Sequence, residues 1–109
     1  MAHLIVDAIA DRLGSNIVVL DMQEITLLAD YFVLCNVGST TQFKAIVDEV
    51  DKRTRQAGSH RLHLEGEPES GWVLLDYGQV VVHIFDPELR AYYNLEELWN
   101  KARLVVHVQ

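Results

Sequence analysis

Apolar residues in the first third of the chain predict a helix followed by two strands. They recur at helical spacing over residues 2–13, and Gly14 is a natural end for that helix. The apolar segment IVVLDM, which begins at Ile17, predicts the first strand. The segment YFVLCNV at residues 31–37 predicts the second, and because it is apolar on both faces apart from Asn36, it is typical of a central strand.

A long amphipathic helix is predicted after the second strand, with Ser39 or Thr40 as its N-terminal cap and Gly58 at its end. Its apolar stripe consists of Phe43, Ile46, Val47 and Val50. Its other side is expected to face water and carries Lys44, Asp48, Glu49, Asp51 and Lys52. Residues 61–66 then alternate like a half-exposed strand, so the strand, helix and strand predict a right-handed parallel crossover.

The segment GWVLLDYGQVVVHIF, residues 71–85, predicts a hairpin. A two-residue Tyr-Gly loop places Asp76 opposite Gln79 and Trp72 opposite His83, and it keeps one face of the hairpin aliphatic. That face carries Val73, Leu75, Val80, Val82 and Ile84. The other face carries Trp72, Leu74, Asp76, Gln79, Val81, His83 and Phe85.

The Trp, Asp and His of this second face have two interpretations. They form a second layer of core, with the His hydrogen-bonded inside, or they belong to a binding surface. Helices that would cover both faces of a sheet of about five strands are hard to find in 109 residues, so part of one face is expected to stay open. An open face with Trp, Leu, Val and Phe is typical of a binding surface.

The C-terminal part is expected to be helical. Asp86-Pro87 begins a helix, and Asn94 with Glu97 resembles a capping box for a last helix. The final LVVHV is compatible with a short strand or a tail. The length predicts a single domain over residues 1–109 with a mixed α/β (α+β) fold, a sheet of about five strands and helices mainly on one face.

The charge of the chain indicates which kind of partner it can bind. Nine Lys and Arg stand against sixteen Asp and Glu, which gives a formal net charge of −7 without any basic run. This balance argues against direct binding of nucleic acid over a broad surface and suits a basic protein partner.

The single Cys35 cannot form an internal disulfide and fits a reducing compartment. The first residues lack the features of a signal peptide, and no apolar run is long enough to span a bilayer, so a cytoplasmic location is expected.

Two candidate chemical sites are weak. Gly38-Ser39 between a strand and a helix is similar to the nucleotidyltransferase signature, which needs paired carboxylates on a neighbouring strand to bind metal ions. The acids nearest in sequence, Asp48, Glu49 and Asp51, are expected on the solvent side of the helix. His63 and Glu65 share a strand face, but His60 does not, and two ligands do not make a zinc site. The sequence therefore predicts no cofactor, no metal site and no catalytic residue.

Several motifs together resemble the ribosomal silencing factor family, also called Iojap-related. The motifs are Asp30-Tyr31-Phe32-Val33, Gly38-Ser39-Thr40, Glu65-Gly66, the block from Trp72 to Phe85, and Tyr93-Asn94-Leu95-Glu96-Glu97-Leu98-Trp99. The resemblance covers nearly the whole chain, and the block 72–99 is highly specific. Gln79 stands where the family usually has Asp, and the N-terminal helix is short for the family.

The resemblance implies a nucleotidyltransferase-like fold without catalysis. It also implies a translational repressor that binds the fourteenth protein of the large ribosomal subunit and blocks joining of the small subunit. The expected partner-binding residues are Trp72, Leu74, Asp76, Tyr77, Val81, His83 and Phe85. Two alternatives remain open from the sequence, which are a nucleotidyltransferase-like enzyme and a homodimeric module that binds another partner.

Overall fold

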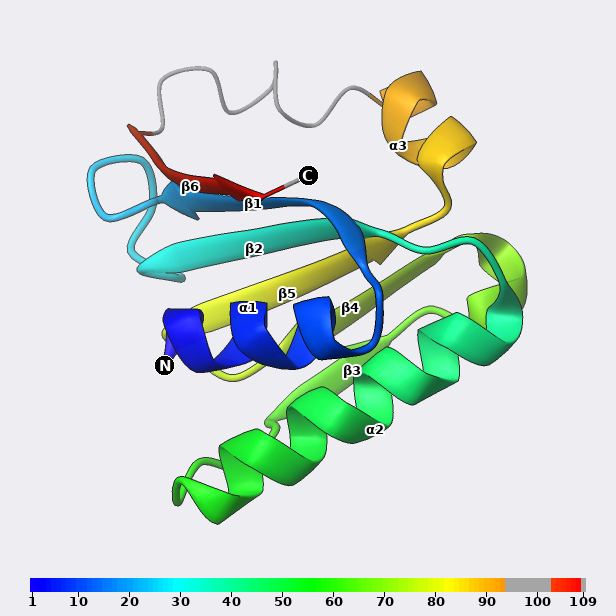
Figure 1. Cartoon of the computed structure of the whole chain (residues 1–109). Coiled ribbons are helices and arrows are strands. Elements are labelled where there is room, and N and C mark those ends of the chain that lie inside the picture. The colour runs from blue at the N-terminus through cyan, green and yellow to red at the C-terminus, as the bar shows by residue number, and fades with distance from the viewer. Residues whose placement is uncertain (94–102, 109) are drawn as a thin grey trace.

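The computed structural model describes residues 1–93 and 103–108, which form a mixed sheet with two helices packed on one face (Figure 1). The elements in chain order are α1 Ala2–Asp11, β1 Ser15–Asp21, β2 Tyr31–Asn36, α2 Thr40–Gln56, β3 His63–Glu65, the 3-10 helix η1 Pro68–Ser70, β4 Trp72–Asp76, β5 Val80–Phe85, α3 Pro87–Tyr93 and β6 Arg103–Val108. The predicted mixed α+β class is confirmed.

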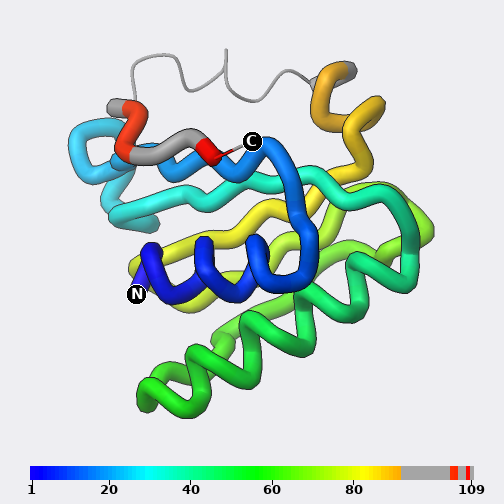
Figure 2. The backbone as a smooth tube through the Cα atoms, viewed as in Figure 1, coloured from blue at the N-terminus to red at the C-terminus, as the bar shows by residue number. Residues whose placement is uncertain are grey.

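The six strands lie in the order β3-β4-β5-β2-β1-β6. Within the described residues, β2 and β5 form the parallel pair and the other neighbouring strands run antiparallel. Instead of about five strands the sheet has a sixth, because the C-terminal segment, for which strand and tail were both open, pairs with β1 as β6. Figure 2 shows this segment beside β1. The central position predicted for β2 is confirmed, since β5 and β1 flank it.

The main core lies between the sheet and the two helices α1 and α2. Ile5 and Ile9 of α1 and Ile46 and Val50 of α2 have no exposed surface, as the helical spacing of these residues predicts. They pack on Val33, Val73, Leu75, Val82 and Ile84 of the sheet. Each buried aliphatic side chain of this kind stabilises the fold by about 1.5–3 kcal/mol, so this face of the sheet is firmly covered.

The ends of the two helices follow local chemistry. The Ser39 Oγ accepts a hydrogen bond from the Gln42 backbone N–H at 3.1 Å, which confirms Ser39 as the cap of α2. Helix α1 ends at Asp11, two residues before the predicted end, because Leu13 has a φ of 65° and leaves the right-handed helical region.

The connection through α2 is the predicted parallel crossover. Strand β3 runs in the same direction as β2, with β5 and β4 between them. Helix α3 is tied back to the sheet by Arg90, whose Nη1 donates to the Asn16 carbonyl at 2.7 Å and to Asn36 Oδ1 at 2.8 Å. The polar exception in the apolar strand β2, Asn36, is therefore the acceptor for a buried arginine.

The predicted last helix, with Asn94 and Glu97, lies outside the described residues. Among the helices of the described part of the chain, none is long and apolar enough to cross a bilayer.

Candidate functional site

The hairpin of β4 and β5 has the two predicted faces but a different register. Trp72 pairs with Phe85 and Asp76 pairs with Val81, so the expected pairing of Trp72 with His83 and of Asp76 with Gln79 was wrong. The register has moved by two residues. Because side chains alternate across a strand with a period of two, every one of them stays on its predicted face.

The turn explains the register. The Tyr77 N–H donates to the Val80 carbonyl at 2.9 Å, so Gly78 and Gln79 form the two-residue loop instead of Tyr77 and Gly78. Gly78 has a φ of 86°, and its N–H donates to Asp76 Oδ1 at 2.7 Å. The sequence pattern could not separate the two registers, because both place Gly78 in the loop and both keep the aliphatic face intact.

Tyr77 lies on the face that is covered by α2. Its side chain is buried in the main core, and its hydroxyl donates a hydrogen bond to the Asp51 carboxylate. Burial of the phenol, together with this bond, raises the pKa of Tyr77. The expectation that Tyr77 belongs to the partner-binding surface therefore does not fit its position, and its role is to tie the hairpin to α2.

The other expected binding residues lie together on the opposite side of the sheet, which we call the outer face. It comprises Trp72, Leu74, Asp76, Val81, His83 and Phe85, and Phe32 of β2 adjoins it. The Trp72 Nε1–H donates to His83 Nδ1 at 3.3 Å. The ring centroids are 5.1 Å apart for Trp72 and Phe85, and 4.8 Å apart for Phe32 and His83, so the four rings form one cluster.

The core interpretation holds for the inner residues of this face, and the binding interpretation stays a prediction for the residues that are accessible. Phe85 is fully buried and packs in a second apolar cluster with Val18, Leu20, Met22 and Leu34, and His83 is only 6% exposed. Trp72, Leu74, Asp76 and Val81 are half-buried. The outer face thus has an inner layer that belongs to the core and an outer layer that remains accessible.

His83 is held neutral. Burial lowers the pKa of His83 from 6.5 to about 4, because the charged imidazolium would lose its hydration. Since Nδ1 accepts from Trp72, the proton of the neutral ring is on Nε2. Among the described residues, no acceptor lies within hydrogen-bond distance of that buried Nε2.

Acidic side chains border the outer face toward the edge strand β3. In the register of β3 and β4, His63 pairs with Asp76 and Glu65 pairs with Leu74, so both β3 side chains share the outer face. The His63 Nε2 lies 2.9 Å from Glu65 Oε1. Across the described part of the chain, no three His, Cys, Asp or Glu side chains converge as metal ligands. Glu65 and Asp76 therefore place two carboxylates next to Leu74 on the outer face.

A hollow lies at the Gly38-Ser39 turn. It has a volume of about 550 Å³, and the acids along it are Glu69, Asp86 and Glu88, which come from η1, from the end of the hairpin and from α3. Sequence reasoning missed these acids because no motif joins them. Asp86 Oδ1 accepts from the Glu88 N–H at 2.8 Å and so acts at the start of α3.

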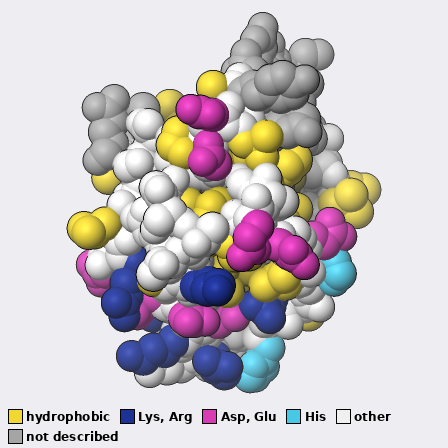
Figure 3. Space-filling view, turned by 90° about the vertical axis from the view of Figure 1, so that its right-hand side faces the viewer, with side chains coloured by type: hydrophobic (Ala, Val, Ile, Leu, Met, Phe, Trp, Pro, Cys, Tyr) yellow, Lys and Arg dark blue, Asp and Glu magenta, His cyan; other side chains and the backbone are white. Residues whose placement is uncertain are grey.

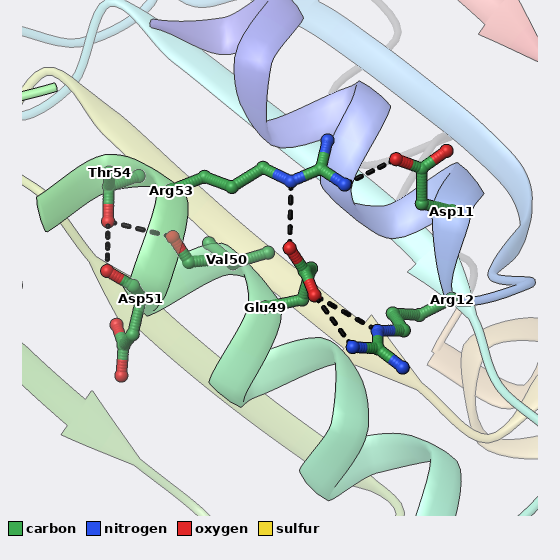
Figure 4. Close-up of polar contacts among 7 residues, drawn as sticks. All are labelled: Asp11, Arg12, Glu49, Val50, Asp51, Arg53 and Thr54. Carbon is green, nitrogen blue, oxygen red and sulfur yellow. Dashed lines mark hydrogen bonds and ion pairs between the residues drawn. The ribbon is translucent and has the colours of Figure 1, made fainter. Parts of the chain in front are cut away.

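The acids that the sequence suggested for this turn do not line the hollow. Figure 4 shows Glu49 between two arginines, with its carboxylate 2.8 Å from Arg53 Nε and 2.8 Å from Arg12 Nη2. Glu49 is buried, so the prediction that it faces water was wrong. The hydrogen bonds from Arg53 and then Arg12 lower the pKa of Glu49. Asp51 accepts from Arg61 Nη1 at 2.6 Å in addition to Tyr77.

These ion pairs are structural. Arg53 also pairs with Asp11, so the network joins α1 to α2 through residues far apart in the sequence. No pattern in the sequence predicts this ion-pair network, because only the packing of the two helices brings these charges together. Cys35 is fully buried, and burial raises the pKa of its thiol to about 12, which is typical of an unreactive core cysteine.

Comparison with known proteins gives a consistent result over the whole chain. The family model for "Ribosomal silencing factor during starvation", RsfS, matches residues 1–109. A protein of Halalkalibacterium halodurans named ribosomal silencing factor RsfS is 42% identical over 105 residues, which cover 96% of this chain and 90% of that protein. The Bacillus subtilis protein of the same name is 44% identical over 94 residues, covering 86% of this chain and 80% of the relative.

A solved structure agrees with the fold. The crystal structure of a protein from Chromobacterium violaceum superposes with a TM-score of 0.86 at 34% sequence identity, and the match covers 91% of this chain and 82% of the other.

Proposed function

Because the chain belongs to the ribosomal silencing factor family, we propose that it represses translation by binding the large ribosomal subunit and blocking the joining of the small subunit. The partner that we propose is the fourteenth protein of the large subunit, and the site of action is the cytoplasm. The mechanism is steric, so the protein needs no catalytic group to carry it out.

The outer face of the hairpin is the observation that carries the proposal. Trp72, Leu74 and Val81 give it an apolar centre, and Asp76 supplies a carboxylate beside them. A Trp that is half-buried in the free protein still has surface to cover in a complex, and such residues often dominate an interface. The hydrogen bond to His83 fixes the indole before the partner arrives.

The charge distribution suits a basic partner. The chain carries a formal net charge of −7. On the side of the molecule seen in Figure 3, the Lys and Arg side chains lie in the lower half with acidic side chains among them, and further acidic and hydrophobic side chains lie above. Complementary charge of this kind speeds the encounter with a basic ribosomal protein and orients it.

The acids that the sequence suggested for catalysis at the Gly38-Ser39 turn have structural partners, which fits a regulatory role without catalysis. The relatives are named as silencing factors. Glu49 and Asp51, which a nucleotidyltransferase-like enzyme would need near this turn, are bound to arginines instead. We therefore expect no metal-dependent turnover of nucleoside triphosphates.

Co-sedimentation with purified large subunits tests the proposal. Trp72→Ala should lower the affinity by roughly thirtyfold or more, which corresponds to about 2 kcal/mol for an anchor residue. Val81→Glu serves as a second variant, because it places a charge on the outer face without removing a large side chain. The matched control is Leu27→Ala, since Leu27 is a fully exposed apolar residue in the loop between β1 and β2.

The melting temperature of each variant separates binding from folding. Loss of co-sedimentation in Val81→Glu with near-native melting, together with normal binding of Leu27→Ala, supports the proposed surface. Normal binding of both outer-face variants would rule this surface out, and failure of the unmodified protein to co-sediment would rule out the proposed function.

We also propose that the free protein forms a weak homodimer through the same face, because a half-exposed apolar surface tends to be covered when its partner is absent. Light scattering over a concentration series tests this, and a monomer at every concentration would contradict it.

A further inference from the structure

A groove lies beside Trp72 at the edge of the outer face. It has a volume of about 440 Å³ and is lined by Glu65, Gly66, Ser70, Trp72, Leu74 and Leu89. These residues come from the end of β3, from η1, from the start of β4 and from α3. The groove is therefore continuous with the surface that the proposed function assigns to the ribosomal partner.

The groove combines apolar walls with one negative charge. Trp72, Leu74 and Leu89 provide the apolar walls, and none of the described residues that line the groove is positively charged. The Glu65 side chain is 65% exposed, so its carboxylate is available to a ligand from outside. Its contact with His63, also an exposed side chain, holds it on the outer face without burying it.

The shape of the groove is fixed in the free protein. The Trp72 indole is positioned by its hydrogen bond to His83 and by the Phe85 ring. On the opposite side, Gly66 brings the chain very close to β4, since a Cβ built on Gly66 would lie 2.2 Å from the Trp72 carbonyl oxygen. The left-handed φ of 85° at Gly66 also requires glycine. A preformed groove lowers the entropic cost of inserting a side chain.

We propose that this groove receives one arginine side chain of the ribosomal partner. This inference rests on the proposed function and identifies the chemistry that the site recognises. The aliphatic stem of an arginine fits against Leu74 and Leu89, and its planar guanidinium stacks on Trp72 while it pairs with Glu65. Lysine suits the groove less well, because its compact ammonium is strongly hydrated and does not stack as a plane.

The first test removes the charge and keeps the shape. Glu65→Gln should lower the affinity for purified large subunits by about tenfold, as expected for a lost hydrogen bond between charged groups. The loss should be smaller at high salt, where charge contributes less. Asp48→Asn is the matched control, because it makes the same change of charge on the exposed side of α2, on the other side of the sheet.

The second test identifies the arginine. Each arginine of the ribosomal protein on the subunit surface is replaced by alanine in turn, and every replacement is combined with Glu65→Gln. One arginine should show a non-additive loss with Glu65→Gln, and replacing that arginine with lysine should not restore full affinity.

The outcomes separate this inference from the proposed function. If Glu65→Gln binds like the unmodified protein while Val81→Glu abolishes binding, the outer face is the interface but the arginine in the groove is ruled out. Additive losses at every arginine would also rule it out. If the unmodified protein does not co-sediment, the proposed function and the inference both fail.

Discussion

Acid should destabilise this protein through His83 as the pH falls from 6.5 to about 4. The pKa of His83 is about 4 in the folded protein, and 6.5 is the ordinary value that applies to the unfolded chain. Between these values the unfolded chain binds a proton that the folded protein does not, so stability is complete above pH 6.5 and is lost as the pH falls. The linkage relation gives a loss of about 2 kcal/mol at pH 5 and about 3 kcal/mol below pH 4.

Urea unfolding at pH 7.5, 6 and 5 measures this loss. The variant His83→Phe keeps an aromatic ring in the cluster, removes the titrating group and removes a buried N–H that has no acceptor among the described residues. Its stability should change between pH 7.5 and pH 5 by about 2 kcal/mol less than that of the unmodified protein. His60→Phe, at an exposed position, is the control and should keep the loss that depends on His83. Equal pH dependence in His83→Phe and the unmodified protein would refute the reasoning.

Two further substitutions test the packing of β3 and of the two helices. Gly66→Ala should destabilise the protein by more than the roughly 1–3 kcal/mol that left-handed backbone strain costs, because the new Cβ meets backbone atoms of β4. Gly58→Ala is the control for the strain alone, since Gly58 has a φ of 87° and no atom lies within 4 Å of the Cβ position. Equal melting temperatures for the two variants would exclude the clash. Glu49→Gln should lower stability at neutral pH and should also reduce the loss of stability below pH 4.5, because the lowered pKa of Glu49 makes its charge stabilising above that pH. Unchanged urea midpoints at both pH 7 and pH 3.5 would contradict the role of the Arg12 and Arg53 pairs.

Local patterns predicted the elements and the faces of the hairpin. The period-two alternation from residue 72 to residue 85 decided which side chains meet α2, and the Ser39 cap could be identified from the residue type and its position. These features depend on neighbours in the sequence, so the sequence alone contains the information.

Features that depend on packing between distant segments could not be predicted. The burial of Glu49 follows from the approach of Arg12, which lies just after the end of α1. The position of Tyr77 under α2 depends on which two residues form the hairpin loop, and the sequence pattern allowed two choices. The groove beside Trp72 needs η1 and α3 in place, and no pattern in the sequence connects those two segments.

The parallel pairing of β2 with β5 at the centre of the sheet also has a consequence for folding kinetics. Val33 pairs with Val82, so the middle of the sheet joins residues separated by α2, β3, η1 and β4. The β4–β5 hairpin and the turns of α2 involve only local contacts and can form early. The central pair requires closure of a long loop, whose entropic cost precedes any gain from the contact. Folding should therefore be slower than for a helical bundle of this length, with its rate limited by the docking of the hairpin onto β2.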